Sequence, residues 1–143
     1  MSECDDMNRE VVAEFRSNQG VVDTAAGGYF KGKPMLILHT TGAKTGAERA
    51  NPLMYLDEGD RRFVFASKGG APDNPDWYYN LIAASEGTVE RGADTYPVTV
   101  HELTGKERDR IYDEQARRYP GFADYARQTA GVRTIPVLAL RRS

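Results

Sequence analysis

The sequence predicts a mainly β (α+β) fold, an antiparallel sheet or barrel of about six strands with three or four helices. The apolar stretches with strand character are short, tight turns join most of them, and they do not alternate regularly with helices. Regular βαβ alternation would indicate a doubly wound parallel sheet, so its absence favours antiparallel pairing. We expect residues 1–143 to form a single domain, with residues 1–26 as an N-terminal helix and lead-in.

The first third of the chain reads as a helix followed by a strand and a glycine turn. Apolar residues on one side predict a helix over about Asp6–Ser17. Gly27-Gly28 breaks the chain before the short apolar strand Met35–Thr41. The turn Gly42–Gly46 then returns the chain to a second strand, from about Arg49 to Leu56.

The middle of the chain predicts a hairpin followed by a helix. Asp57–Asp60 reads as a tight turn that leads to the strand Arg61–Ala66. Asn74 followed by Pro75 predicts a helix start, with the asparagine as N-cap and the proline at the first helical position. That helix continues to about Ala84.

The last third predicts two more strands, a helical region and a final strand. Turn residues 92–94 separate the strands Thr88–Arg91 and Thr95–Glu102. Thr104 and Glu107 have the spacing of a capping box, which opens a helix to about Arg118. A short helical piece follows Gly121, and the last strand is Thr134–Leu140.

Composition excludes several classes of protein. A net charge of -2 argues against a nucleic-acid partner, which would need a basic face. The single Cys4 forms no internal disulfide, and the acidic start lacks the basic region of a signal peptide. The apolar run Met35–Leu38 is too short to span a bilayer. We therefore expect a cytoplasmic protein, with membrane association through the N-terminal helix as the open alternative.

Standard catalytic motifs are absent. The turn Gly42–Gly46 superficially suggests a phosphate-binding P-loop, but Ala47 follows the glycine where a lysine is required. No dinucleotide-binding glycine fingerprint and no nucleophile elbow occur. His39 and His101 lack neighbouring ligands, so each reads as a strand-face residue and no metal is expected. An enzyme without such groups usually takes its chemistry from a cofactor.

Three cations lie in or beside glycine-rich turns of this acidic chain. Lys44 lies inside the turn Gly42–Gly46, Arg49 opens the strand that follows, and Lys68 directly precedes Gly69-Gly70. Backbone N–H groups in such turns, with an arginine fork and a lysine charge, favour binding of a phosphate. Taken singly, the two lysines fit solvated loop positions equally well; together the three cations favour an anion site.

Aromatic residues near the C-terminus allow two interpretations. Tyr119, Phe122 and Tyr125 recur at intervals of three, so they share one face of a helix. They either pack in the core with hydroxyls at its rim, or form a wall over a flat substrate. Trp77 and Tyr78 allow the same two interpretations, and we expect Trp77 to pack in the core.

An ordered set of short blocks carries a resemblance that covers about Gly27 to Leu140. The blocks are Thr40-Thr41-Gly42-Ala43-Lys44-Thr45-Gly46, Asn51-Pro52-Leu53, Ala66-Ser67-Lys68-Gly69-Gly70, Asn74-Pro75-Asp76-Trp77-Tyr78, Tyr119-Pro120-Gly121-Phe122 and Thr134-Ile135-Pro136-Val137. Their order resembles the deazaflavin-dependent nitroreductases, also described as quinone reductases. The resemblance implies a split β-barrel like that of flavin reductases, with coenzyme F420 as hydride donor.

The resemblance also implies roles for the matching residues. Phosphate or tail contacts fall on Lys44, Thr45 and Arg49; ring contacts fall on Pro52, Leu53, Tyr55, Ala66, Ser67 and Lys68, with Trp77 and Tyr78 completing the pocket. Tyr119, Phe122 and Tyr125 would face the substrate. Because Phe122 has no hydroxyl, the candidates for protonating or polarising the acceptor are Ser67, Tyr119 and Tyr125.

These observations predict an oxidoreductase that transfers a hydride from reduced F420 to a quinone, nitroaromatic or unsaturated lactone. One alternative is a reductase of the same fold that uses FMN. Another is a non-enzymatic deazaflavin-binding protein, and the lowest-ranked is a lipid- or quinone-binding module at a membrane surface. The expected partner is a small-molecule acceptor, and the chain is expected to be a monomer or homodimer.

Overall fold

One seven-stranded antiparallel sheet organises the chain, in the order β2-β1-β5-β6-β7-β4-β3. The computed structural model describes residues 3–42, 46 and 48–143. The strands are β1 Met35–Thr41, β2 Glu48–Met54, β3 Leu56–Glu58, β4 Arg61–Phe65, β5 Glu86–Arg91, β6 Asp94–Glu102 and β7 Val137–Arg142. The α-helices among the described residues are α1 Glu3–Ser17, α2 Asp76–Ala84, α3 Gly105–Arg118 and α4 Gly121–Thr129, with short 3₁₀ turns η1 Ala25–Gly28 and η2 Lys68–Gly70. The predicted antiparallel pairing is confirmed.

The strand count exceeds the prediction because the strand expected to end at Leu56 divides at Tyr55. The N–H of Tyr55 donates to the carbonyl of Pro34 at 3.3 Å instead of joining a ladder. On one side of this break, β2 pairs with β1; on the other, β3 pairs with β4. The sheet therefore begins and ends on consecutive segments of the chain, and this brings its two edges together.

Two helix caps and one strand start differ from the prediction. Pro75 is the N-cap of α2, and the Asn74 side chain accepts a hydrogen bond from Arg133 instead of capping. Thr104 is the N-cap of α3 but makes no side-chain cap bond. The last strand starts at Val137 rather than Thr134, because the carbonyl of Ile135 accepts two hydrogen bonds from a side chain of α3.

The sheet separates two apolar clusters. The inner cluster takes side chains from β1, β4, β5, β6 and β7, together with Trp77 and Leu81 of α2. The outer cluster takes the alternate residues of β1, β4 and β7 and packs them against α1, α3 and α4. Adjacent residues of a strand point to opposite faces, so Leu36 and Leu38 are inner while Met35 and Ile37 are outer.

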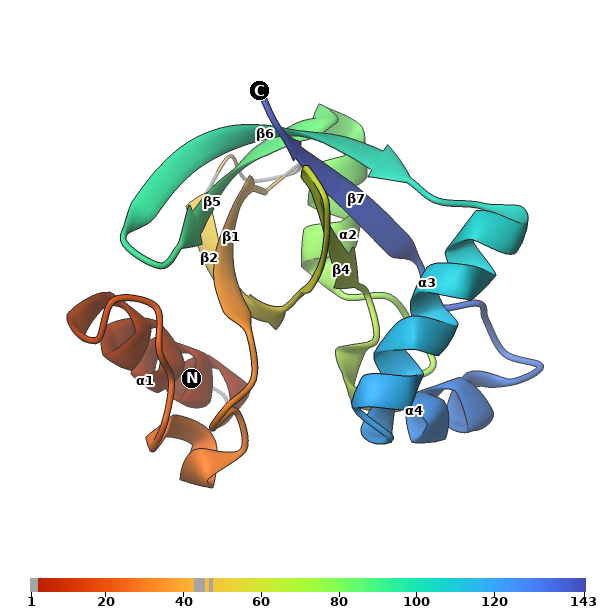
Figure 1. Ribbon diagram of the computed structural model, residues 1–143, viewed down its shortest axis with the longest axis horizontal. Helices are drawn as coiled ribbons and strands as arrows, with labels where there is room; N and C mark the ends of the chain where they lie inside the picture. Colours follow the sequence, from red (N-terminus) through yellow and green to blue (C-terminus); the bar gives the residue numbers. More distant parts are fainter. Residues whose placement is uncertain (1–2, 43–45, 47) are drawn as a thin grey trace.

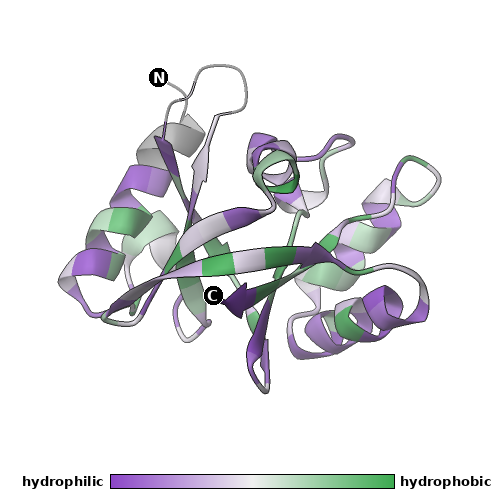
Figure 2. Cartoon of the chain, turned by 90° about the horizontal axis from the view of Figure 1, so that it is seen from above, coloured by the Kyte–Doolittle hydropathy of each residue, from purple (hydrophilic) through white to green (hydrophobic). Residues whose placement is uncertain are grey.

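The helices cover the curved sheet at different places. In Figure 1 the strands β5 and β6 arch over the molecule, α1 lies at the lower left, and α3 with α4 lies at the lower right. Figure 2 shows apolar and polar segments along the strands, with the polar ones toward the strand ends and turns. No helix among the described residues has the length and apolar character needed to cross a membrane.

Candidate functional site

The segment after β4, residues 67–70, forms a tight loop that we call the glycine loop. Lys68, Gly69 and Gly70 have positive φ values of 48°, 63° and 84°. Glycine adopts this conformation without a steric penalty, whereas a lysine there is uncommon. The Ser67 carbonyl accepts the N–H of Gly70 at 2.9 Å, which closes the turn. The Ser67 hydroxyl makes no hydrogen bond to any described residue, so it can serve a ligand.

Arg133 fixes this loop from the opposite end of the sequence. Its guanidinium donates to the carbonyls of Ala66 at 3.1 Å, Ser67 at 2.8 Å and Ala71 at 3.0 Å. It also donates to Oδ1 of Asn74 at 2.8 Å. Four charge-assisted bonds from one planar group set both the position and the orientation of the loop backbone.

The glycine loop packs closely against α4. A Cβ on Gly70 would lie 1.9 Å from Oε1 of Gln128 and 3.3 Å from Cδ1 of Tyr125. A side chain at this position would therefore require the exposed end of the Gln128 side chain to move. On the exposed side of the loop, Nζ of Lys68 pairs with Oδ2 of Asp73 at 3.1 Å, and this pair lowers the pKa of Asp73. A ligand that recruits Lys68 has to compete with that carboxylate.

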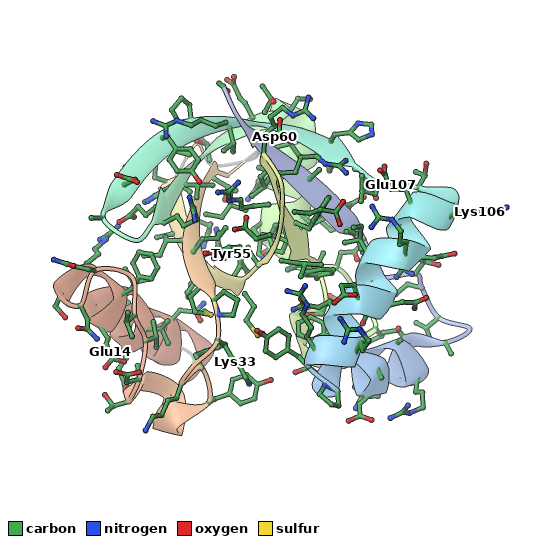
Figure 3. All side chains as sticks on the ribbon, in the orientation of Figure 1. Glu14, Lys33, Tyr55, Asp60, Lys106 and Glu107 are labelled. Atoms are coloured by element: carbon green, nitrogen blue, oxygen red, sulfur yellow. The ribbon has the colours of Figure 1, made fainter. Side chains whose placement is uncertain are left out.

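An aromatic cluster extends from α4 to the segment before β1. The hydroxyls of Tyr29 and Tyr125 lie 3.1 Å apart, and the ring of Phe122 lies 5.3 Å from that of Tyr125 and 5.6 Å from that of Phe65. Nζ of Lys33, labelled in Figure 3, lies 3.7 Å from the Tyr29 ring centre. The cluster therefore joins two segments far apart in the sequence around one polar contact.

Burial and the Tyr29 contact determine the acidity of Tyr125. Desolvation first, and then the hydrogen bond with Tyr29, raise the pKa of Tyr125 to about 12. Its hydroxyl is therefore protonated near neutral pH and can donate a hydrogen bond to an oxygen of a bound molecule. Tyr119 is half-buried against the outer cluster, and Phe122 is buried in it.

An open groove of about 620 Å³ runs between α1 and β2. Arg9, Arg16 and Arg49 line it together with a single carboxylate among the described lining residues, that of Glu48. Arg49 is exposed and lies opposite Thr40 in the ladder with β1. Because Arg16 already pairs with Glu90, Arg49 is the arginine of this groove that best suits an anionic ligand. Lys44 and Thr45, the other predicted phosphate contacts, lie outside the described residues.

A three-residue polar contact holds α1 beside this groove. Arg16 donates to Glu90 through Nη2 at 2.8 Å and Nε at 3.1 Å, and Nε2 of His39 lies 2.5 Å from the same carboxylate. The Arg16 hydrogen bond is the main cause that lowers the pKa of Glu90. His39 and His101 both lie on strands, as predicted.

The predicted ring-lining residues lie on both faces of the sheet. Pro52 alternates with Ala50 and Met54, which pack in the outer cluster, whereas Leu53 and Tyr55 pack against the inner one. Pro52 is on β2, which ends the sheet, so its missing N–H costs no ladder bond.

Three more predicted contacts belong to the inner cluster. Ala66 and Trp77 are buried there, which confirms the expected core position of the tryptophan. The Tyr78 hydroxyl donates to both oxygens of Glu102, at 2.9 and 3.0 Å. Burial, reinforced by this carboxylate, raises the pKa of Tyr78 to about 12.

The structure thus gathers the glycine loop, Tyr119, Phe122 and Tyr125 on one side of the sheet, and leaves Leu53, Tyr55, Trp77 and Tyr78 on the other. Sequence reasoning missed Arg133 and Tyr29. Arg133 precedes the Thr134–Val137 block of the resemblance, but no local pattern shows that its partners lie 59 to 67 residues away. Tyr29 follows Gly27-Gly28 and carries no periodic signal.

These features fit a flat cofactor with an anionic tail. A glycine loop with a free serine hydroxyl admits close approach of a ring, and the unpaired edge of β2 offers backbone groups to it. The arginine-lined groove beside β2 suits a phosphate or carboxylate tail.

Comparison with known proteins agrees with this chemistry. Residues 7–142 match the family model described as F420H(2)-dependent quinone reductase. The chain is 36% identical over 115 residues to an F420H(2)-dependent quinone reductase of Mycobacterium tuberculosis, covering 76% of this chain and 74% of that protein.

Solved structures give the same result. A structure described as an F420-H2 dependent reductase, FDR-A, is 38% identical, with a TM-score of 0.67 over 76% of this chain and 94% of that one. A second, described as a domain-swapped dimer, is 32% identical, with a TM-score of 0.69 over 98% and 100%. The heme storage protein HutZ of Vibrio cholerae, at 11% identity and a TM-score of 0.57 over 92% and 87%, shows likeness of fold alone. The predicted split-barrel fold is confirmed.

Proposed function

The chain belongs to the F420H(2)-dependent quinone reductase family, and from this premise we propose that it reduces a small, flat quinone with reduced coenzyme F420. The observation that supports this assignment most directly is the contact between the glycine loop and the aromatic face of α4. A flat ring and a flat acceptor both require such a surface, with polar groups at its rim.

The residues of the chain would hold the cofactor at two places. Arg49, with Lys44 and Thr45, would bind the phosphate or the acidic tail, while Pro52, Ser67 and Lys68 would contact the ring or its ribityl chain. When bound, the reduced cofactor supplies the hydride. Because Arg133 fixes the carbonyls of Ala66 and Ser67, the ring-side contacts are organised before the cofactor arrives.

Tyr119, Phe122 and Tyr125 would contact the acceptor. The hydroxyl of Tyr125 is the preferred donor to a quinone oxygen, because it lies in the polar contact with Tyr29 at the edge of the aromatic cluster and is protonated near neutral pH. Ser67 and Tyr119 are the other candidates for polarising or protonating that oxygen. The apolar rings of the cluster exclude water from the reacting atoms, which strengthens these hydrogen bonds.

The predicted contacts on the inner face would support the site by packing and would not touch the ring directly. They are Leu53, Tyr55, Ala66, Trp77 and Tyr78. Trp77 and Ala66 fill the interior beneath the glycine loop and so limit its movement. Tyr78 is tied to Glu102, which leaves its hydroxyl engaged away from the outer face.

Binding of the cofactor tests the anchoring assignment. In a fluorescence titration with oxidised F420, Arg49→Gln is expected to weaken binding about 10- to 100-fold, since a charged hydrogen bond contributes roughly 1.5–3 kcal/mol. Arg117→Gln, an exposed arginine of α3, is the control and should bind like the wild type. Equal affinity of all three proteins would remove Arg49 from the cofactor site.

Turnover tests the reaction. Reduced F420 is mixed with the protein and, in turn, a benzoquinone, a naphthoquinone, a nitroaromatic and an unsaturated lactone, and the absorbance of the oxidised cofactor is followed. We expect the absorbance of oxidised F420 to reappear fastest when the acceptor is a quinone. Displacement of F420 by equimolar FMN would favour the flavin-using alternative, and binding without faster oxidation by any acceptor would favour a carrier.

A further inference from the structure

The inner face of the half-barrel ends in three arginines that the proposed reaction does not use. Arg62 on β4, Arg91 on β5 and Arg142 on β7 all line one cavity of about 80 Å³. This cavity lies away from the glycine loop, because Arg62 and Ser67 lie at opposite ends of β4. Asp60, labelled at the top of Figure 3, marks this end of the sheet.

Strand alternation places all three side chains on the inner face of the sheet, with Arg62 and Arg91 half-buried and Arg142 exposed at its rim. Arg62 precedes the inner residue Val64 by two positions, Arg91 follows Val89 by two, and Arg142 follows Leu140 by two. Apolar side chains fill the same face deeper in the sheet. Three strands therefore change from apolar residues to arginine at the same end of the interior.

Two of these arginines, Arg91 and Arg142, have neutral partners, and only Arg62 has a carboxylate beside it. Arg91 donates from Nε to the Tyr96 hydroxyl at 3.2 Å and also bonds the Tyr55 hydroxyl, and the Arg142 guanidinium lies 4.6 Å from the Tyr96 ring centre. Both sets of partners are neutral. Arg62 pairs with Asp57 at 2.8 Å.

Asp60 is the single carboxylate among the described lining residues, and it lies 3.5 Å from Arg141 outside the cavity. Guanidinium groups that line one small cavity repel one another unless an anion lies between them, and of these three only Arg62 already has a carboxylate partner. Aromatic side chains hold two of the groups in fixed orientations, which lowers the entropic cost of binding such an anion.

We propose that this end of the half-barrel binds a phosphate group between Arg62, Arg91 and Arg142. Each guanidinium presents a fork of N–H donors that matches two oxygens. A tetrahedral anion can offer an oxygen toward each of three strands, whereas a planar carboxylate offers only two oxygens. A volume of about 80 Å³ suits one such group and excludes a deazaflavin ring. The group is either free phosphate or the terminal phosphate of a small phosphomonoester.

Titration of the cofactor-free protein tests this site. Inorganic phosphate is added at low ionic strength, with chloride at matched ionic strength as the blank, and binding is measured by calorimetry and by the Nε–H resonances of ¹⁵N-labelled arginine. We expect saturable binding that moves the Arg91 and Arg142 resonances. Glycerol phosphate in a parallel titration distinguishes the sources: tighter binding than phosphate indicates a phosphomonoester, and equal binding indicates the free ion.

Neighbouring arginines provide matched variants. Arg142→Gln is expected to raise the dissociation constant about tenfold or more. Arg141→Gln removes the same charge from the adjacent residue, whose side chain points to the other face of the sheet and is 61% exposed. This control should change the dissociation constant of phosphate less than about threefold. Arg62→Gln should act like Arg142→Gln.

Three results would overturn the proposal. The first is an absence of saturable phosphate binding by the wild type, and the second is equal weakening by Arg141→Gln and Arg142→Gln, which indicates net charge alone. The third is loss of phosphate binding in Arg49→Gln with none in Arg142→Gln, which assigns the anion to the cofactor groove.

Discussion

Replacing Arg133 by glutamine tests whether one guanidinium organises the candidate site. The substitution removes four donors that hold Ala66, Ser67, Ala71 and Asn74. Charged hydrogen bonds contribute about 1.5–3 kcal/mol each, so a simple sum gives about 6–12 kcal/mol. The true loss is smaller, because the carbonyls of the half-buried Ser67 and Ala71 regain water and bonds to one group are not additive.

We therefore expect Arg133→Gln to lower the free energy of unfolding by about 2–4 kcal/mol. At about 3 °C per kcal/mol for a domain of this size, Tm falls by roughly 6–12 °C. The same loop carries Ser67 and Lys68, so we also expect the dissociation constant of F420 to rise at least about tenfold, measured at a temperature where the variant is folded.

Two further variants separate the clamp from the loss of a charge. Arg127→Gln removes an exposed arginine of α4 paired with Asp124, and its Tm should stay within about 2 °C of the wild type. Arg133→Lys keeps the charge but loses the planar fork, so its Tm and affinity should fall between those of the wild type and Arg133→Gln. If Arg133→Gln matches Arg127→Gln in both Tm and F420 affinity, the loop does not depend on the clamp.

Further predictions concern the same face of the molecule. Gly70→Ala should lower stability by up to about 1 kcal/mol more than Gly69→Ala, because both have positive φ but only the first displaces the end of the Gln128 side chain; adding Gln128→Ala should recover that difference in a denaturant titration. Tyr29→Phe should move the Tyr125 pKa from about 12 part of the way toward 10, read from ultraviolet absorbance, since desolvation persists after the hydrogen bond is lost. The raised folded-state pKa stabilises the protein below pH 10, so this part of the stability should disappear between about pH 10 and 12 and be smaller in Tyr125→Phe; an unchanged pH profile would contradict it.

Local patterns predicted those elements whose own residues determine them. The strand Met35–Thr41 was predicted with the bounds that the structure has, because four apolar residues between turn signals leave little alternative. The division at Tyr55 was not predictable, since it depends on a hydrogen bond to Pro34 and on the pairing of β3 with β4. The predicted cap at Asn74 failed for the same reason: Arg133 competes for its side chain.

The residues of the candidate site likewise fall into those that local sequence patterns indicate and those that only the fold reveals. Glycines and lone cations are visible in a sequence, so the sequence indicates the glycine loop and Arg49 as ligand contacts, and this role stays a prediction. Arg133 could not, because its importance comes from four acceptors that become neighbours only in the folded sheet. Tyr29 shows the same limit, since only the fold brings it to Tyr125.

Strand alternation adds a constraint that resemblance by itself does not supply. Pro52 and Leu53 belong to one block of the resemblance and Tyr55 follows it closely, yet side chains one residue apart on β2 face opposite sides of the sheet. They cannot all touch one face of a flat ring through their side chains. The glycine loop escapes this constraint, because it follows the last residue of β4 and turns back through positive φ values toward α4. A contact made by that loop can therefore lie on the outer face of the sheet, even though the side chain of Ala66, directly before the loop, packs on the inner face. One loop can therefore connect the proposed cofactor site on the outer face to packing in the barrel interior.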